Sequence, residues 1–533
     1  MNARTPIAIL ALAIGGVISW ILVQTSEKDL VEETSKTSSY KSISTEKPNP
    51  TSDRKRVAKS NRNPNFDPNA IPYERLIAFS NEKDYRDFLS RLGKSNLRNL
   101  GQIDALRSVR LGFDNYSDFE SLEIDPEDLQ FNFPVTIPEL DQVPLQTGIV
   151  GFGSSALSFL GITGDNSNWG EGVKIAVIDT GIVEHIALSD DITHINLVEI
   201  PEGEEPNSHG TSVASLIAGN HPNLTGVAPA AELISVRVAD ETGFSTSFLL
   251  AEGIIAASDA GAHLINISLG SGSDSPLVRQ AVEYATERGT VIFASSGNSG
   301  SENAAFPAGN ENVFAVGAVD ALGQHLNFSS SDSDLAFTAP GLDVNAAFPG
   351  DLVTSFTGTS GAVAFPVGAV AAIMSESETR LTASLAVEIL NSHTNEAGVP
   401  GADNDFGIGI IDIGRALNRD IPGIEDLAVA SQTYLFPTEE NPSAGLQVSI
   451  ENRGTEPLFQ SSIEIGFAGD FYPLNIQSIE PNERQVITIP AGLGLLQEEG
   501  QLNVKSQVTL AGGTPDDNSS NDRRDEVIRL PEE

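Results

Sequence analysis

Three short segments, far apart in the chain, each place a chemically reactive side chain among small residues. They are residues 177–181 (VIDTG), 207–211 (NSHGT) and 358–362 (GTSGA). They supply an acid, a base and a nucleophile in the order Asp, His, Ser, which is one of the known arrangements for acyl transfer by an activated serine. The chain must therefore adopt a fold that brings three distant segments to one place.

Serine is a weak nucleophile at neutral pH, so a base must take its proton. His209 is the candidate base for Ser360, and Asp179 is the candidate carboxylate that orients the imidazole. Asp179 follows an apolar run at 173–178 that predicts a buried parallel strand, so its carboxylate should emerge at the carboxyl edge of a sheet. His209 and Ser360 each precede Ala-rich apolar stretches, which predict that both lie at the start of buried helices.

Acyl transfer also needs donors for the oxyanion that develops on the substrate carbonyl. Residues 291–300 (VIFASSGNSG) predict a second buried strand that ends in small residues. Asn298 stands at its end with an amide free to donate, and the backbone N–H of Ser360 is the expected second donor.

Further segments follow in a fixed order: 226–229 (GVAP), 266–270 (NISLG), 314–320 (FAVGAVD) and 339–341 (APG). Together with the first three, this set resembles the subtilisin-like serine peptidases over roughly residues 150–420. The resemblance implies a serine endopeptidase with Asp179, His209 and Ser360 as the triad and Asn298 as the oxyanion donor. It also implies that an extended substrate pairs with the chain at a second set of residues: Ser268, Leu269, Gly270 and Gly243.

The chain departs from the family pattern behind the serine. The family usually has Met after the serine and Pro four positions after it, whereas this chain has Gly361 and Ala364, with Pro366 two residues later. Two alternatives remain open: a catalytically silent relative that binds peptides at its surface, and an aspartic peptidase. The second would need a dimer, because the chain has one Asp-Thr-Gly.

Composition limits the other possibilities. The chain has 533 residues, no Cys, and a formal charge of −42, which argues against nucleic acid as a partner. Residues 151–420 contain 7 basic and 33 acidic residues, a balance that indicates a soluble acidic surface or adaptation to a salty medium. The chemistry requires no cofactor. Structural calcium is an expectation for the family, but no loop, 331–334 included, offers the converging oxygens it needs, so no metal ligand is assigned.

The N-terminal part predicts export. Residues 7–23 are apolar or small and follow Arg4, which favours an uncleaved signal anchor over a cleaved signal peptide within segment 1–24. Residues 25–70 are rich in Ser, Thr, Lys, Asn and Pro and predict a disordered linker. The protein is therefore expected to be exported, and either membrane-anchored or secreted.

Two further domains flank the predicted peptidase. Residues 71–145 predict strand, helix, strand and helix, with Ser80 as the cap of the first helix, and resemble the small α+β propeptides of this family, which act as intramolecular inhibitors. A spacer domain is the alternative. Residues 421–533 predict six short strands in an antiparallel β-sandwich and resemble Ig-like modules related to cell adhesion. The predicted fold is thus α/β: a subtilisin-like parallel sheet flanked by helices over 146–420, between these two domains.

Overall fold

The computed structural model describes residues 66–122, 124–140, 146–201, 204–376, 379–436, 445–490, 500–513 and 516–529. The predicted anchor at 1–24, and the predicted linker up to residue 65, lie outside these residues. Among the helices of the described ranges, none combines the length and apolar character needed to cross a bilayer.

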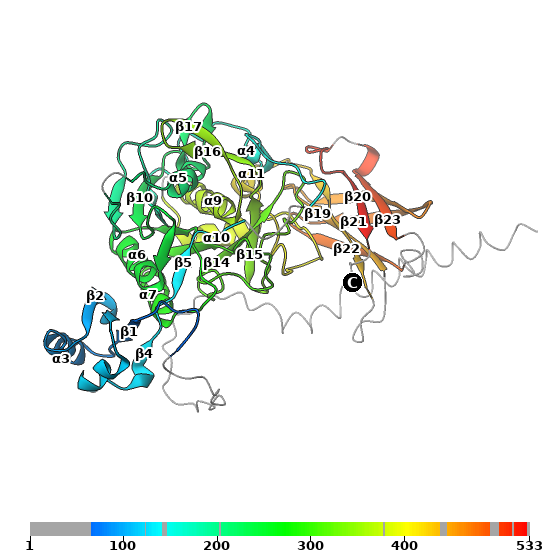
Figure 1. The fold of residues 1–533 in the computed structure, drawn as a ribbon. Helices are drawn as coiled ribbons and strands as arrows, with labels where there is room; N and C mark the ends of the chain where they lie inside the picture. Colours follow the sequence, from blue (N-terminus) through cyan, green and yellow to red (C-terminus); the bar gives the residue numbers. More distant parts are fainter. Residues whose placement is uncertain are drawn as a thin grey trace, which may run out of the picture. The chain divides into compact units, whose positions relative to one another are not determined.

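Seven parallel strands form the central sheet, in the order β15-β14-β13-β12-β6-β10-β7. Figure 1 labels β10, β14 and β15 of this sheet. They are β6 (Lys174–Asp179), β7 (Thr193–Asn196), β10 (Glu232–Arg237), β12 (Leu264–Ile267), β13 (Val291–Ser295), β14 (Phe314–Val319) and β15 (Leu335–Pro340). The apolar run at 173–178 is β6, in the interior of the sheet, as its composition predicts. The parallel sheet with flanking helices confirms the predicted fold class.

Helices cover both faces of this sheet. Alternate side chains of β6 enter different cores: Ile175 and Val177 enter one, Ala176 and Ile178 the other. The first core contains α4 (Ala156–Phe159), α5 (His209–Ala218), α8 (Thr359–Ala362), α9 (Ala364–Ser375), α10 (Ala383–Asn391) and α11 (Ile413–Asn418). The second contains α6 (Ser247–Asp259) and α7 (Pro276–Thr286).

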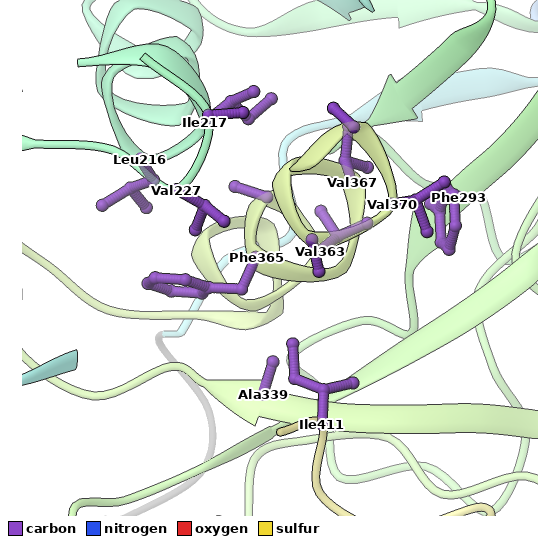
Figure 2. Close-up of a cluster of buried hydrophobic side chains, with 14 of the residues drawn as sticks. Leu216, Ile217, Val227, Phe293, Ala339, Val363, Phe365, Val367, Val370 and Ile411 are labelled. Carbon is purple, nitrogen blue, oxygen red and sulfur yellow. The ribbon is translucent and has the colours of Figure 1, made fainter. Parts of the chain in front are cut away.

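Helix α9 is buried on every side except at its last residue, as an all-apolar helix requires. Figure 2 shows Val370 on the side of Phe293 and Val227 on the opposite side. A Cβ at Gly368 would lie 2.6 Å from the Cβ of Val227, so glycine allows this close contact. Pro366 falls in the first turn of α9, where a missing N–H breaks no helical bond.

Shorter elements complete the peptidase part: β8 (Asn220–His221), β9 (Leu224–Thr225), β11 (Phe244–Thr246), β16 (Val344–Phe348) and β17 (Leu352–Phe356). Strand β5 (Pro134–Thr136), which precedes the peptidase part in the chain, pairs with β11.

The N-terminal region contains an antiparallel sheet in the order β2-β3-β1-β4, packed on helix α3 (Glu82–Leu92). Its strands are β1 (Glu74–Ala78), β2 (Arg98–Ile103), β3 (Ser108–Gly112) and β4 (Leu129–Gln130). The sequence places Tyr85, Phe88, Leu89 and Leu92 on one face of α3; Tyr85, Phe88 and Leu92 are buried, and Leu89 is half-buried. The predicted cap was wrong by one residue: Asn81, not Ser80, accepts the backbone N–H of Asp84. The predicted helix at 116–122 is a 3₁₀ helix, η2 (Tyr116–Leu122).

The C-terminal region contains two antiparallel sheets, β18-β19-β22 and β21-β20-β23-β24, which share one apolar core. The strands are β18 (Leu427–Leu435), β19 (Gly445–Asn452), β20 (Leu458–Phe467), β21 (Asp470–Ile479), β22 (Arg484–Ile489), β23 (Gln501–Thr509) and β24 (Arg523–Arg529). All six predicted strands are present. Strand β21 was not predicted, and it contains Pro473 and lies at a sheet edge, where proline is tolerated.

Buried charges join the C-terminal region to the peptidase part. Glu451 accepts hydrogen bonds from Arg415 at 3.2 Å, Arg453 at 3.0 Å and Arg484 at 3.3 Å. Arg415 belongs to α11 of the peptidase part, and Arg484 also pairs with Glu396 at 3.0 Å. Burial alone would raise the pKa of the Glu451 carboxyl, but the three guanidiniums outweigh burial and lower that pKa from 4.5 to about 2.

We expect Glu451→Gln to destabilise the protein by about 3–5 kcal/mol, because it leaves buried guanidiniums without their counter-charge. Since the folded pKa of Glu451 lies below the unfolded value, its contribution is present above pH 4.5 and is lost as the pH falls toward 2. Thermal unfolding of wild type and variant should therefore differ most at neutral pH and converge in acid. Glu464→Gln, at an exposed position of β20, is the matched control. Equal stability of Glu451→Gln and wild type at pH 7 would contradict this account.

Candidate active site

Asp179 and His209 form a buried hydrogen-bonded pair. Asp179 is the last residue of β6, and His209 is the first residue of α5. The Nδ1 atom of His209 lies 2.8 Å from Oδ1 and 2.9 Å from Oδ2 of a carboxylate that is fully buried. A ring nitrogen fixed in this way leaves Nε2 on the opposite side of the imidazole as the proton acceptor.

Thr180 links the strand that carries Asp179 to the helix that carries His209. Its Oγ1 donates to the carbonyl of Asn207 at 3.2 Å and accepts the N–H of Gly210 at 3.1 Å. Only glycine fits at position 210, because a Cβ there would lie 2.4 Å from the carbonyl oxygen of Gly181. The small residues beside the acid and the base therefore allow their two segments to touch.

Ser360 is the second residue of α8, directly after Gly358 and Thr359. Its Oγ donates to the carbonyl of Ser268 at 3.4 Å, and Ser268 Oγ in turn donates to the carbonyl of Ser360 at 3.1 Å. Within the described residues, no hydrogen bond joins Ser360 Oγ to His209. Rotation of the serine side chain away from Ser268 would free its proton for another acceptor.

Asn298 lies three residues after β13 and is held by the segment that carries the serine. Its Oδ1 accepts both the N–H and the Oγ1–H of Thr359, each at 2.9 Å. This fixes the amide so that Nδ2 points the other way, where it donates to the carbonyl of Pro138 at 2.8 Å. The amide thus already binds a peptide carbonyl.

That carbonyl belongs to a strand of the same chain. Strand β5 pairs antiparallel with β11, and Thr136 exchanges two backbone hydrogen bonds of 2.9 Å with Gly270. The N–H of Ile137 donates to the carbonyl of Gly243 at 3.3 Å. Residues 134–138 therefore lie between two edges of the peptidase part, as an extended peptide would.

The four positions expected to bind substrate have different places in the structure. Gly270 and Gly243 bind the backbone of segment 134–138, and the carbonyl of Ser268 accepts the Ser360 hydroxyl. Leu269 is fully buried and packs in the core of the α6–α7 face.

A cavity of about 620 Å³ opens beside Pro138 and Glu139. Gly270, Asn298 and Phe306 are among the residues that line it. Such a cavity, next to the carbonyl held by Asn298, can receive the side chain of the residue that carries this carbonyl. Its lining comes from the two loops near 270 and 300 that flank the predicted site.

Sequence reasoning did not assign Thr180 and Thr359, although both adjoin predicted catalytic residues. The sequence feature that could have identified them is their position: each threonine stands between a candidate catalytic residue, Asp179 or Ser360, and a glycine. It also missed Asn132, which is fully buried and whose Oδ1 accepts the N–H of Phe248 and the hydroxyl of Ser247 at the start of α6.

For metals, the ranges that the structure describes bring together no group of three or more His, Asp and Glu side chains able to hold an ion.

Comparison with known proteins identifies the fold and its chemistry. Residues 170–409 match the model of the subtilase family, Peptidase_S8. The chain is 34% identical over 296 residues to alkaline protease of Shouchella clausii, covering 55% of this chain and 75% of that protein. It is 37% identical over 244 residues to subtilisin Savinase of Lederbergia lenta, a match that covers 45% of this chain and 89% of that protein. It is 31% identical over 341 residues to alkaline elastase YaB of a Bacillus species, a match that covers 63% of this chain and 89% of that protein. The chain belongs to the subtilase family and is a serine endopeptidase.

Proposed function

We propose that Ser360 is the nucleophile of this endopeptidase, His209 its general base and Asp179 the residue that orients the base. The observation that carries the proposal is the bond from His209 Nδ1 to the buried carboxylate of Asp179. In the reaction, Ser360 Oγ attacks the scissile carbonyl while His209 Nε2 takes its proton. His209 then gives that proton to the leaving amine, and water hydrolyses the acyl-enzyme in the same way.

Asn298 and the backbone N–H of Ser360 would stabilise the tetrahedral oxyanion. The bond from Asn298 Nδ2 to the Pro138 carbonyl supports this role, because the amide already faces a peptide oxygen. Thr359 acts as a positioning residue, since it holds the other end of the same amide. A catalytically silent peptide receptor, the alternative function, has no use for this arrangement.

We also propose that the N-terminal region, residues 71–145, is an intramolecular inhibitor. Its last described residues occupy the cleft, and Asn132 and Phe133 bind the first residue of α6. Because a strand in the cleft excludes a second peptide, the uncut chain would be latent. A mere spacer domain would not need these contacts.

Other proposals rest on sequence alone. Export of the chain, with segment 1–24 as an anchor or a signal, agrees with a propeptide that keeps the enzyme latent. The Ig-like character of residues 421–533 and an unplaced structural calcium ion are proposals of the same kind. The substrates are proteins or peptides as a class.

A serine-directed fluorophosphonate tests the nucleophile. After removal of the N-terminal region, the wild type should be labelled at Ser360 and should hydrolyse peptides. Ser360→Ala should lose labelling and about 10⁶-fold in kcat, the loss seen on removing this serine in subtilisin. Ser158→Ala, at an exposed position of α4, should match the wild type. Labelling that persists in Ser360→Ala would contradict the assignment.

We expect Asn298→Asp to lower kcat by ~10²–10³-fold, the size of effect known for this amide in subtilisin, with little change in KM. The carboxylate can still accept the bonds from Thr359, so the variant removes the donor and keeps the support. Steady-state kinetics on one peptide substrate gives both constants. A rise in KM at unchanged kcat would show that Asn298 serves binding alone.

Gly361 makes a further prediction, because the usual Met beside the nucleophile is absent. The remaining methionines are Met1 and the buried Met374. We expect the wild type to keep most of its activity in peroxide, whereas Gly361→Met should lose it progressively. A Cβ at position 361 would lie 2.9 Å from the Phe356 ring, so the substitution itself changes the activity before peroxide is added. Each protein is therefore compared by the fraction of its own starting activity that it retains. Rapid loss in the wild type would refute this expectation.

A further inference from the structure

The register of the strand in the cleft determines what the carbonyl of Ser268 would bind. Thr136 and Gly270 exchange both of their backbone hydrogen bonds. In an antiparallel ladder, such hydrogen-bonded pairs recur at every second residue. The next pair along the cleft is therefore residue 138 with Ser268, and in that pair the N–H of residue 138 would donate to the Ser268 carbonyl.

Residue 138 is a proline, which has no N–H to give. The carbonyl of Ser268 instead accepts the hydroxyl of Ser360, at 3.4 Å. The strand thus leaves a carbonyl open beside the nucleophile, and that carbonyl takes the hydroxyl proton that His209 must receive for attack. Proline at this one position therefore removes one backbone hydrogen bond from the strand, and the Ser360 hydroxyl is directed at the Ser268 carbonyl.

A cavity also adjoins Pro138, which is one of the residues that line it. The adjacent cavity measures about 620 Å³, within the range that encloses a whole small ligand. A pyrrolidine ring is short and conformationally fixed, so it fills little of that space. The residue gives up a backbone hydrogen bond and much of the apolar contact that a longer side chain would make. Both interactions would otherwise support attack on its carbonyl.

We propose that Pro138 is a brake on self-cleavage: it presents its carbonyl to Asn298 yet makes the Pro138–Glu139 bond a slow substrate. The inference rests on the proposed roles of Ser360 and His209. In the slowed step, Ser360 Oγ bonds to the Pro138 carbonyl carbon, and its proton passes through His209 to the nitrogen of Glu139 as the C–N bond breaks. Water then hydrolyses the ester, which releases a carboxylate at Pro138 and restores the serine hydroxyl.

The test compares self-cleavage in the full chain. Wild type and Pro138→Ala are purified in an inactive state, transferred to assay conditions, and followed by N-terminal sequencing for a new end at Glu139. Alanine restores the N–H and remains small, so we expect cleavage at 138–139 to be about tenfold faster or more. Pro138→Leu, which also fills the cavity, should be at least as fast. Pro126→Ala, at an exposed proline of η3 (Pro126–Asp128), should match the wild type.

A second measurement does not depend on how the variants fold. The processed enzyme is given two peptides that differ only at one position, Val-Thr-Ile-Pro-Glu-Leu and Val-Thr-Ile-Ala-Glu-Leu, and kcat/KM should favour alanine by at least about tenfold. Equal rates for both peptides, no acceleration in Pro138→Ala, or wild-type cleavage at another bond between 139 and 150 would each overturn the inference. If no form hydrolyses any peptide, the proposed function fails first and the inference falls with it.

Discussion

The active site depends on strands of a parallel sheet that end at the same edge. Strand β6 delivers Asp179 there, and β13 leads to Asn298 at the same edge. Side-chain hydrogen bonds then tie two helix starts to these strand ends: Thr180 bonds to the segment of His209, and Thr359 bonds to Asn298. The reactive groups are thus fixed by burial and by short polar contacts rather than by flexible loops.

Under the proposed function, the same edge lets one cleft serve both catalysis and latency. An extended segment can pair with Gly270 and Gly243 whatever its origin, because these bonds use only the backbone. In this chain the segment that does so is its own residues 134–138, and the carbonyl of Pro138 reaches the amide of Asn298. If the proposed brake operates, the residue whose carbonyl faces Asn298 decides whether such a strand is a substrate or an inhibitor, and in this chain that residue is Pro138.

Local patterns predicted much of this, and contacts between distant segments account for the misses. An apolar run predicted β6, because burial on both faces of a parallel sheet imposes that pattern directly. Strand β2 escaped prediction because its residues are mostly exposed and carry no alternation. The candidate catalytic residues stand in motifs that can be recognised in the sequence, whereas the contacts of Thr359 and Asn132 depend on partners far away in the chain.

A crystal structure of the full-length Ser360→Ala protein would test this arrangement most directly, because the variant cannot cut its own strand. The account predicts that Asp179 lies within hydrogen-bond distance of His209 Nδ1, that residue 136 pairs with Gly270, and that the carbonyl of Pro138 meets the amide of Asn298. A cleft from which residues 134–138 are absent, or an Asn298 amide directed elsewhere, would contradict it.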